Sequence, residues 1–209
     1  MGRLRKYTFN ENYFENIDSQ EKAYFLGFMY ADGCVAKKQN FSRITLQERD
    51  KEILEKFKIL LNYKGSLHYS KRYKALRLSL FSSKMKQDLI KNGCIPQKTF
   101  KLTFPNWLRE DLKRHFIRGY FDGDGCVSLI KGNRFRAAIG AREEFLKVIL
   151  ELSKIRGYIH KYSSQRIWYL RYFGSSAISF LTWLYKDATI YLERKHQKFL
   201  DYLENKGGR

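Results

Sequence analysis

Two aspartates, each followed by a glycine, are the residues of this sequence best placed to do chemistry. Asp32 closes the segment FLGFMYADG and Asp124 closes IRGYFDGDG, 92 residues further on. Each follows an apolar stretch of helical length, so each carboxylate is expected at the C-terminal end of a helix. The helix dipole and mutual repulsion disfavour two carboxylates there, whereas a divalent cation favours them. One Asp-Gly helix end would be a weak signal, but two at one spacing predict a metal-binding catalytic site.

The same spacing of 92 residues relates many other positions, so the chain is predicted to consist of two related halves. The matching pairs include Leu60 with Leu152, Gly65 with Gly157, His68 with His160, Phe81 with Phe173, and Leu89 with Leu181. The only two prolines, Pro96 and Pro105, lie between the halves. We therefore expect an N-terminal half at 1–92, a connecting segment at 93–113 and a C-terminal half at 114–209.

Hydrophobic periodicity predicts an α+β fold in which each half has the order αββαββα. The expected elements of the first half are 23–30, 34–38, 43–48, 51–61, 66–72, 76–81 and 83–91. Those of the second are 116–121, 126–131, 134–140, 143–154, 158–163, 167–173 and 175–186, with a final helix near 191–205. Asp50 is a plausible N-cap of the helix at 51–61. Each half is thus expected to contain one saddle-shaped antiparallel sheet.

Gly27 and Gly119 lie in the middle of the two helices that precede the aspartates. Glycine inside a helix costs about 1 kcal/mol relative to alanine. Close approach of two backbones would compensate this cost. The two glycines therefore predict that the helices pack face to face, which would bring Asp32 and Asp124 side by side.

The two segments resemble the nine-residue motif of the LAGLIDADG homing endonucleases, and the repeat resembles the single-chain members that carry two motifs. The resemblance implies Asp32 and Asp124 as metal ligands, with Gly33 and Gly125 as the turn residues that complete the site. It also implies two or more Mg²⁺ ions shared between the half-sites, and double-strand DNA cleavage that leaves short 3′ overhangs. Lys98 and Lys195 resemble the lysines that assist catalysis in this family, although a solvated surface lysine is the plainer interpretation of each.

Strand alternation indicates which side chains would face a DNA duplex. The leucines at 76, 78 and 80 share one face, which leaves the intervening residues outward, and the same rule applies to the other strands. The outward set, rich in arginine and amide groups, suits the major groove. It comprises Lys38, Arg43, Gln47, His68, Arg72, Arg77, Arg134, Arg136, His160, Tyr169 and Arg171. Gln47 is matched with Gly140 and Arg77 with Tyr169, so an asymmetric target is expected.

Three other acidic residues near these segments are left out of the predicted site. Asp122 has Tyr30 as its counterpart in the first half, so its role is not shared and a structural or capping role is favoured. Asp50 and Glu143 follow the second strand of each half, near where relatives hold polar groups that position water. Helix capping explains Asp50 equally well.

Composition agrees with a nucleic-acid-binding protein. Lys and Arg number 41 against 21 acidic residues, a formal charge of +20, and a basic surface of this size attracts polyanions. No apolar run is long enough to span a membrane, and no apolar segment follows the N-terminal charges, so neither a membrane partner nor a secretory leader is expected. Cys34, Cys94 and Cys126 form no CxxC pair, which disfavours a zinc ribbon. We expect an intracellular monomer that binds double-stranded DNA.

Two alternatives remain at this stage. The same fold can bind nucleic acid without cutting it, as in relatives that act as RNA maturases, for which intron RNA is the partner, or as DNA-binding regulators. Retention of both Asp32 and Asp124 argues against a degenerate regulator but leaves a maturase open. A merely basic structural protein would leave the paired Asp-Gly segments unexplained. No intein splicing segment is recognised beside the repeats.

Overall fold

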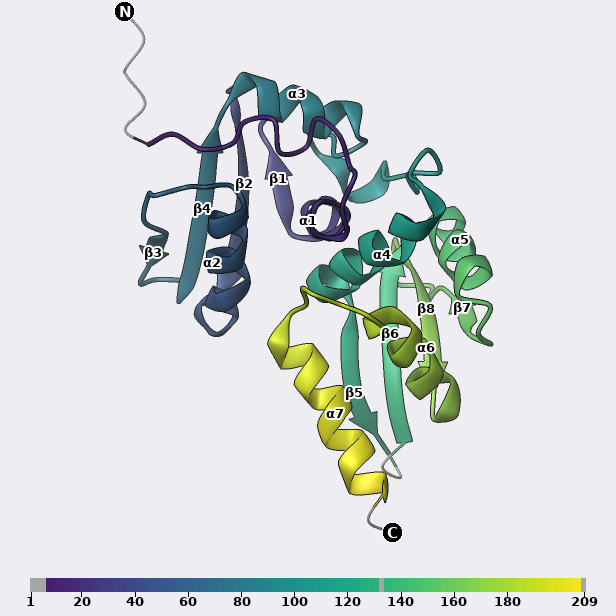
Figure 1. Ribbon diagram of the computed structural model, residues 1–209. Helices are drawn as coiled ribbons and strands as arrows, with labels where there is room; N and C mark the ends of the chain where they lie inside the picture. Colours follow the sequence, from purple (N-terminus) through teal and green to yellow (C-terminus); the bar gives the residue numbers. More distant parts are fainter. Residues whose placement is uncertain (1–6, 132–133, 208–209) are drawn as a thin grey trace, which may run out of the picture.

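The computed structural model describes residues 7–131 and 134–207, which form two similar halves around a pair of crossing helices (Figure 1). The elements of the first half are α1 (Gln20–Ala31), β1 (Gly33–Val35), β2 (Phe41–Gln47), α2 (Lys51–Leu60), β3 (His68–Ser70), β4 (Ala75–Phe81) and α3 (Ser83–Lys91). Those of the second are α4 (Glu110–Asp124), β5 (Cys126–Ile130), β6 (Arg134–Ala141), α5 (Glu143–Ser153), β7 (Tyr158–His160), β8 (Trp168–Phe173), α6 (Ser175–Tyr185) and α7 (Glu193–Gly207). α4 begins within the stretch expected to connect the halves.

Each half contains one four-stranded antiparallel sheet, ordered β1-β2-β4-β3 in the first and β5-β6-β8-β7 in the second. Identical strand order in both halves confirms the predicted pseudo-symmetric α+β fold. The registers correct one detail. Thr45 lies opposite Arg77, and Gly140 lies opposite Tyr169, so the counterpart of Gly140 is Thr45 and not Gln47. The loop between the first two strands differs in length between the halves, which shifts the match by two residues.

α1 and α4 pack against each other at the centre of the molecule, where their backbones touch (Figure 1). A Cβ atom added at Gly27 would overlap the carbonyl oxygen of Phe116, and one at Gly119 would overlap that of Tyr24. Any larger side chain at either position would separate the helices, so close approach explains two glycines that helix propensity alone disfavours.

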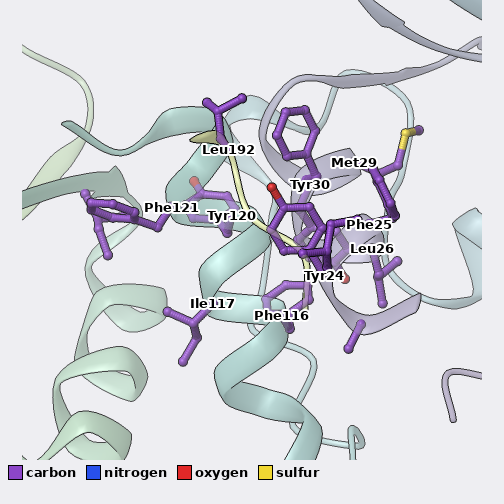
Figure 2. Packing of buried hydrophobic residues seen from close by; sticks show 14 of the residues in the cluster. Tyr24, Phe25, Leu26, Met29, Tyr30, Phe116, Ile117, Tyr120, Phe121 and Leu192 are labelled. Carbon is purple, nitrogen blue, oxygen red and sulfur yellow. The ribbon is translucent and has the colours of Figure 1, made fainter. Parts of the chain in front are cut away.

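The core is strongly aromatic and continues through the helix pair into both halves (Figure 2). The ring of Tyr30 on α1 meets that of Phe116 on α4 edge to face, with centroids 4.9 Å apart. In the first half Phe25 stacks on Phe57 of α2 at 4.1 Å. This packing fixes α1 and α4 relative to the sheets, and therefore fixes the positions of their C-terminal ends.

Within the described residues of the first half no helix corresponds to α7, which covers part of the second sheet. Its Tyr202 stacks on Phe135 of β6 with centroids 4.1 Å apart, and Phe199 is buried beside the same ring. The helix runs along β5 (Figure 1), and its first turn is tied to the last turn of α4 by hydrogen bonds from Lys195. Among the described residues no helix combines the length and the apolar character needed to cross a lipid bilayer.

Three expectations about local structure are wrong. Asp50 precedes α2, but its side chain makes no capping hydrogen bond, because both of its oxygens accept from Arg194 instead. The strand expected at 66–72 is shorter: β3 ends at Ser70, and Arg72 lies in the hairpin turn. Likewise β1 ends at Val35, so Lys38 lies in the exposed loop before β2.

Candidate active site and nucleic-acid interface

The C-terminal ends of α1 and α4 meet, and each ends at one of the two aspartates. Gly123, next to Asp124, lies so close to Ala31 that a Cβ there would overlap the alanine methyl, and it would come within 3.3 Å of Oδ2 of Asp32. Gly33 and Gly125 then lead into β1 and β5. A Cβ at either would come within 2.5 Å of the carbonyl oxygen four residues earlier, so these glycines allow a tight exit from the helix.

Electrostatics at the helix ends oppose two negative charges. Desolvation, and next the nearby Asp124 carboxylate, raise the pKa of Asp32 to about 6, although Lys195 and Lys98 partly oppose the shift. The pKa of Asp124 is also raised, mainly by desolvation and against the same two lysines. Asp124 presents more of its surface to water than Asp32, so water solvates its charge more fully. A pair of carboxylates that repel each other is stabilised by a cation between them.

Lys98 reaches the C-terminal end of α1, and Lys195 reaches the C-terminal end of α4. The Lys98 ammonium donates to the carbonyl oxygens of Ala31 at 2.9 Å and Gly33 at 2.6 Å. The Lys195 ammonium donates to those of Phe121 at 2.8 Å and Asp122 at 2.7 Å. Each lysine therefore satisfies carbonyls that a helix end leaves free. Lys195 is only 4% exposed, and burial lowers its pKa to about 8.

The oxygen donors at the helix ends fit a hard divalent cation. The described residues contain no group of three or more His, Cys, Asp or Glu side chains arranged to hold a metal. Asp32 and Asp124 would therefore supply the only two side-chain ligands, and water, backbone carbonyl and phosphate oxygens would complete the shell. Mg²⁺ is bound in this way, with few protein carboxylates and substrate phosphates. The carbonyl of Gly33 already accepts from Lys98.

Asp122, two residues before Asp124, is buried and fully hydrogen-bonded. Its oxygens accept from the Tyr24 hydroxyl at 2.9 Å, the Tyr185 hydroxyl at 2.8 Å and the Leu192 backbone N–H at 2.7 Å. Burial raises the pKa of this carboxyl, and Lys195 opposes the shift. These contacts join α1, the end of α6 and the start of α7, in agreement with the structural role expected for it.

Asp50 and Arg194 form an ion pair between the two halves that sequence reasoning missed. Arg194 Nε and Nη2 donate to Asp50 Oδ1 at 2.9 Å and Oδ2 at 3.1 Å, and Asp50 is 7% exposed. Glu143, which follows the second strand of the other half, pairs instead with Lys147 of its own helix at 2.7 Å. The repeat offered no signal for this pair, because no helix among the described residues of the first half corresponds to α7.

Both sheets present a polar outer face on the side away from their helices. In the first half, neighbouring strands align Arg43 with Ser79, and Thr45 with Arg77 and His68. In the second, Arg171 lies opposite Ala138 and Tyr158. The alternate residues expected to point inward are buried, among them Ile44, Leu78, Leu170 and Tyr172. Most of the expected outward set therefore lies on these faces: Arg43, Gln47, His68, Arg77, Arg134, Arg136, His160, Tyr169 and Arg171.

The two outer faces differ in chemistry. The first carries mainly hydroxyl, amide and guanidinium groups. The second is rich in rings: Tyr158 packs near Phe173, and His160 near Tyr162 and Tyr169. The Arg171 guanidinium lies over the Tyr162 ring at 5.0 Å and donates to its hydroxyl at 2.7 Å. The two faces therefore offer different chemical groups to a ligand.

Several donors on these faces have no partner within the described part of the chain. Arg77 Nε and Arg171 Nε are such donors, and His160 Nε2 is a ring nitrogen that donates or accepts according to its tautomer; all three atoms are buried from water. An unsatisfied buried donor is costly in a finished structure and is readily explained at a ligand-binding surface. These atoms make the outer faces a candidate ligand-binding surface.

Comparison with known proteins identifies the family. A family model described as a LAGLIDADG-like domain matches residues 19–82 and 111–182, one segment in each half. The chain belongs to the LAGLIDADG family.

Solved LAGLIDADG structures share this fold along most of their length. The chain is similar to the homing endonuclease I-LtrWI bound to target DNA (TM-score 0.60, 13% identity, 95% of this chain and 92% of that one). It is also similar to I-AabMI bound to uncleaved DNA (0.61, 15%, 87% and 88%). A third is I-SmaMI bound to uncleavable DNA (0.62, 15%, 89% and 90%). At these identities the likeness establishes the fold of the LAGLIDADG chain.

One relative is named for a function other than DNA cleavage. The probable translation initiation factor IF-2 of Methanocaldococcus jannaschii is 30% identical over 131 residues, which are 59% of this chain and 10% of that protein. The LAGLIDADG chain thus corresponds to a small part of a much longer polypeptide.

Proposed function

We propose that this LAGLIDADG protein is a site-specific homing endonuclease that makes metal-dependent double-strand cuts in a long, asymmetric DNA target. The observation that carries the proposal is the meeting of two helix ends, each with one aspartate and one capping lysine, between two sheets with basic outer faces. The two lysines cap the helix ends whether or not the protein cuts DNA, but two desolvated carboxylates facing each other, with the pKa of Asp32 raised to about 6, have no evident purpose in a protein that only binds DNA.

The proposed reaction is hydrolysis of one phosphodiester in each strand. Water adds to phosphorus, the bond to the 3′ oxygen breaks, and the products are a 3′ hydroxyl and a 5′ phosphate. Mg²⁺ bound by Asp32 and Asp124 would supply Lewis-acid activation of the phosphate and of the attacking water. Lys98 and Lys195 place positive charge where negative charge develops on the phosphoryl oxygens. The cuts would lie across the minor groove and leave short 3′ overhangs.

The sheets would bind the DNA on either side of the cuts. Two-stranded ribbons fit the major groove, where arginine recognises guanine. Because the outer faces of the two halves differ, each half of the target would have its own base preferences. The excess of 20 positive charges would contribute phosphate contacts and make affinity fall steeply with added salt.

The deciding experiment is a cleavage selection on a randomised or genomic DNA library with Mg²⁺, run beside the Asp32→Asn, Asp124→Asn double variant. We expect a single long asymmetric cut site with 3′ overhangs. Cutting should be lost in each single variant, Asp32→Asn and Asp124→Asn, while binding is largely retained. Full activity of either single variant would contradict the assignment.

The second candidate is a protein of the same fold that binds intron RNA or DNA without cutting. The ring-rich face of the second sheet favours it to some degree, because exposed aromatic residues stack on unpaired bases in RNA-binding proteins. Retained binding of one DNA site or of a structured intron RNA, with no cutting by the unaltered protein, would replace the endonuclease proposal with this one.

A further inference from the structure

The segment that leads from α6 to the helix carrying Lys195 has no regular secondary structure. α6 ends at Tyr185 and α7 begins at Glu193, so residues 186–192 form a loop, and Lys195 lies in the first turn of α7. A lysine in the first turn of a helix that follows a loop holds a fixed position only if the loop is anchored. The anchor therefore determines where the ammonium lies.

Asp122 anchors both ends of this loop with one buried carboxylate. Oδ1 accepts from the hydroxyl of Tyr185, the last residue of α6, at 2.8 Å. Oδ2 accepts from the backbone N–H of Leu192, the residue just before α7, at 2.7 Å. The Leu192 carbonyl in turn accepts from the backbone N–H of Lys195 at 3.0 Å. Two consecutive hydrogen bonds thus join Asp122 to the backbone of Lys195.

In the first half, the chain that leads to Lys98 is held by a tyrosine hydroxyl in place of a carboxylate. Tyr30, the counterpart of Asp122, donates its hydroxyl to the carbonyl oxygen of Asn92 at 2.7 Å. Asn92 ends α3 and begins the segment that leads to Lys98. In both halves the residue two before the aspartate therefore holds the chain that carries the lysine, so the expectation that this role is not shared between the halves is wrong. The partner is a carbonyl in one half and an N–H in the other, which explains why one residue is Tyr and the other Asp.

The other half also contributes to the anchor. Tyr24 of α1 donates to Asp122 Oδ2 at 2.9 Å, and Arg194, next to Lys195, pairs with Asp50. These bonds hold the first turn of α7 against elements of the first half as well as against α4.

We propose that Asp122 is a positioning residue for Lys195, which fixes the start of α7 so that the ammonium lies at the end of α4. The proposal rests on the proposed function only in assigning Lys195 to the cleavage step. The contacts that make Asp122 an anchor are independent of that assignment.

The test measures single-turnover cleavage of the selected target by Asp122→Asn, which keeps the shape of the side chain but lacks the charge. We expect the rate to fall roughly 10- to 100-fold, as for other groups that orient a functional side chain, with target affinity changed less than about 3-fold. In a Lys195→Met background the same substitution should cause no further loss. In a Lys98→Met background it should cause its full loss. Equal losses in both backgrounds would overturn the proposal.

A second measurement does not need cleavage and so separates this proposal from the endonuclease proposal. In Asp122→Asn, hydrogen exchange at the amides of residues 192–197 should accelerate by about 10-fold or more, while the later turns of α7 stay protected. Tyr30→Phe is the matched control and should affect residues 92–98 instead. Unchanged exchange at 192–197 would overturn the proposal whether or not the protein cuts DNA.

Tyr185→Phe serves if Asp122→Asn does not fold. It removes one bond to the carboxylate and leaves the bond to Leu192 in place. We expect the same dependence on Lys195 with a smaller loss, roughly 3- to 10-fold. A fall in thermal stability with no change in the single-turnover rate of either variant would assign Asp122 to stability alone.

Discussion

At the scale of single residues, Lys98 and Lys195 combine two tasks that are usually separate. Each ammonium satisfies helix-end carbonyls, and each remains close enough to the aspartates to oppose the rise in the pKa of Asp32. A lysine that only capped a helix would not need to lie close enough to both aspartates to lower their pKa values. The geometry thus makes the stability of the helix end and the charge of the site depend on the same atom.

The types of these residues were predictable, but their partners were not. The repeat and the motif resemblance pointed to both aspartates and both lysines. The partners of Asp122 include a backbone N–H, and every residue except proline has one, so no sequence signal distinguishes Leu192. Asp50 was expected to cap α2 because Asp is a common cap. Its pairing with Arg194 depends on the path of α7, which the sequence did not specify.

One residue prediction concerns His115, which is 8% exposed and has its Nδ1 2.7 Å from Arg118 Nη1. Burial, and next the charge of Arg118, lower the pKa of His115 to about 4. Between pH 6.5 and 4 the unfolded chain therefore binds more protons at this residue, and stability falls as pH falls. Between pH 6.5 and 4, the free energy of unfolding of His115→Gln should fall by roughly 1–3 kcal/mol less than that of the unaltered protein. Urea unfolding at several pH values measures the difference. His68→Gln, on an exposed strand, is the control, and identical pH slopes for His115→Gln and the unaltered protein would contradict the prediction.

At the scale of elements, α1 and α4 contact each other through backbone atoms at Gly27 and Gly119. We expect Gly27→Ala to reduce the free energy of unfolding by roughly 2–4 kcal/mol, because overlap with Phe116 outweighs the gain of about 1 kcal/mol in helix propensity. Gly140→Ala is the matched control. Its Cβ would lie 3.1 Å from the flexible end of Ile167, so a change below about 1 kcal/mol is expected by chemical denaturation. Similar losses for both variants would argue against the close-contact explanation.

Strand alternation leads to a second prediction: of two adjacent strand residues, one affects DNA recognition and the other affects stability. Arg77→Ala on the outer face should relax base preference at a few target positions by roughly 1–3 kcal/mol each and leave stability nearly unchanged. Leu78→Ala on the inner face should cost roughly 2–5 kcal/mol of stability and leave the preference profile intact. Denaturation and cleavage of a panel of single-base target variants measure the two effects. A uniform loss across the panel for Arg77→Ala would undo the assignment of faces.

The order of elements was predictable because each half repeats the same periodicity, and a pattern that occurs twice is easier to recognise than one that occurs once. Strand ends were less predictable. Lys38 and Arg72 were expected on strands and lie in loops, because alternation continues through a hairpin whose turn residues have no strong signature. Unequal loops also misaligned Gln47 with Gly140, an error that only the hydrogen-bond register could reveal.

At the scale of the whole molecule, two halves in one chain predict a monomer on a single DNA site. One LAGLIDADG chain already supplies both helices, both sheets and both lysines, so a second copy would add nothing to the site. Sedimentation of the protein with the selected duplex should give one chain per duplex. The Asp32→Asn, Asp124→Asn variant can be used in the same assay to prevent cleavage. An obligatory dimer on one site would contradict the prediction.

The bonds from Tyr24 to Asp122 and from Arg194 to Asp50 have a consequence for hybrid proteins built from halves of different family members. Contact between α1 and α4 needs only a glycine in each helix, so it would tolerate exchange of a half that keeps its glycine. The two bonds instead need a particular side chain in each half, and they join the first half to Asp122 and to the segment that carries Lys195. A hybrid that keeps only the second half would fold around the shared helices, yet it would need Tyr24 and Asp50 transplanted with it to cut at the original rate.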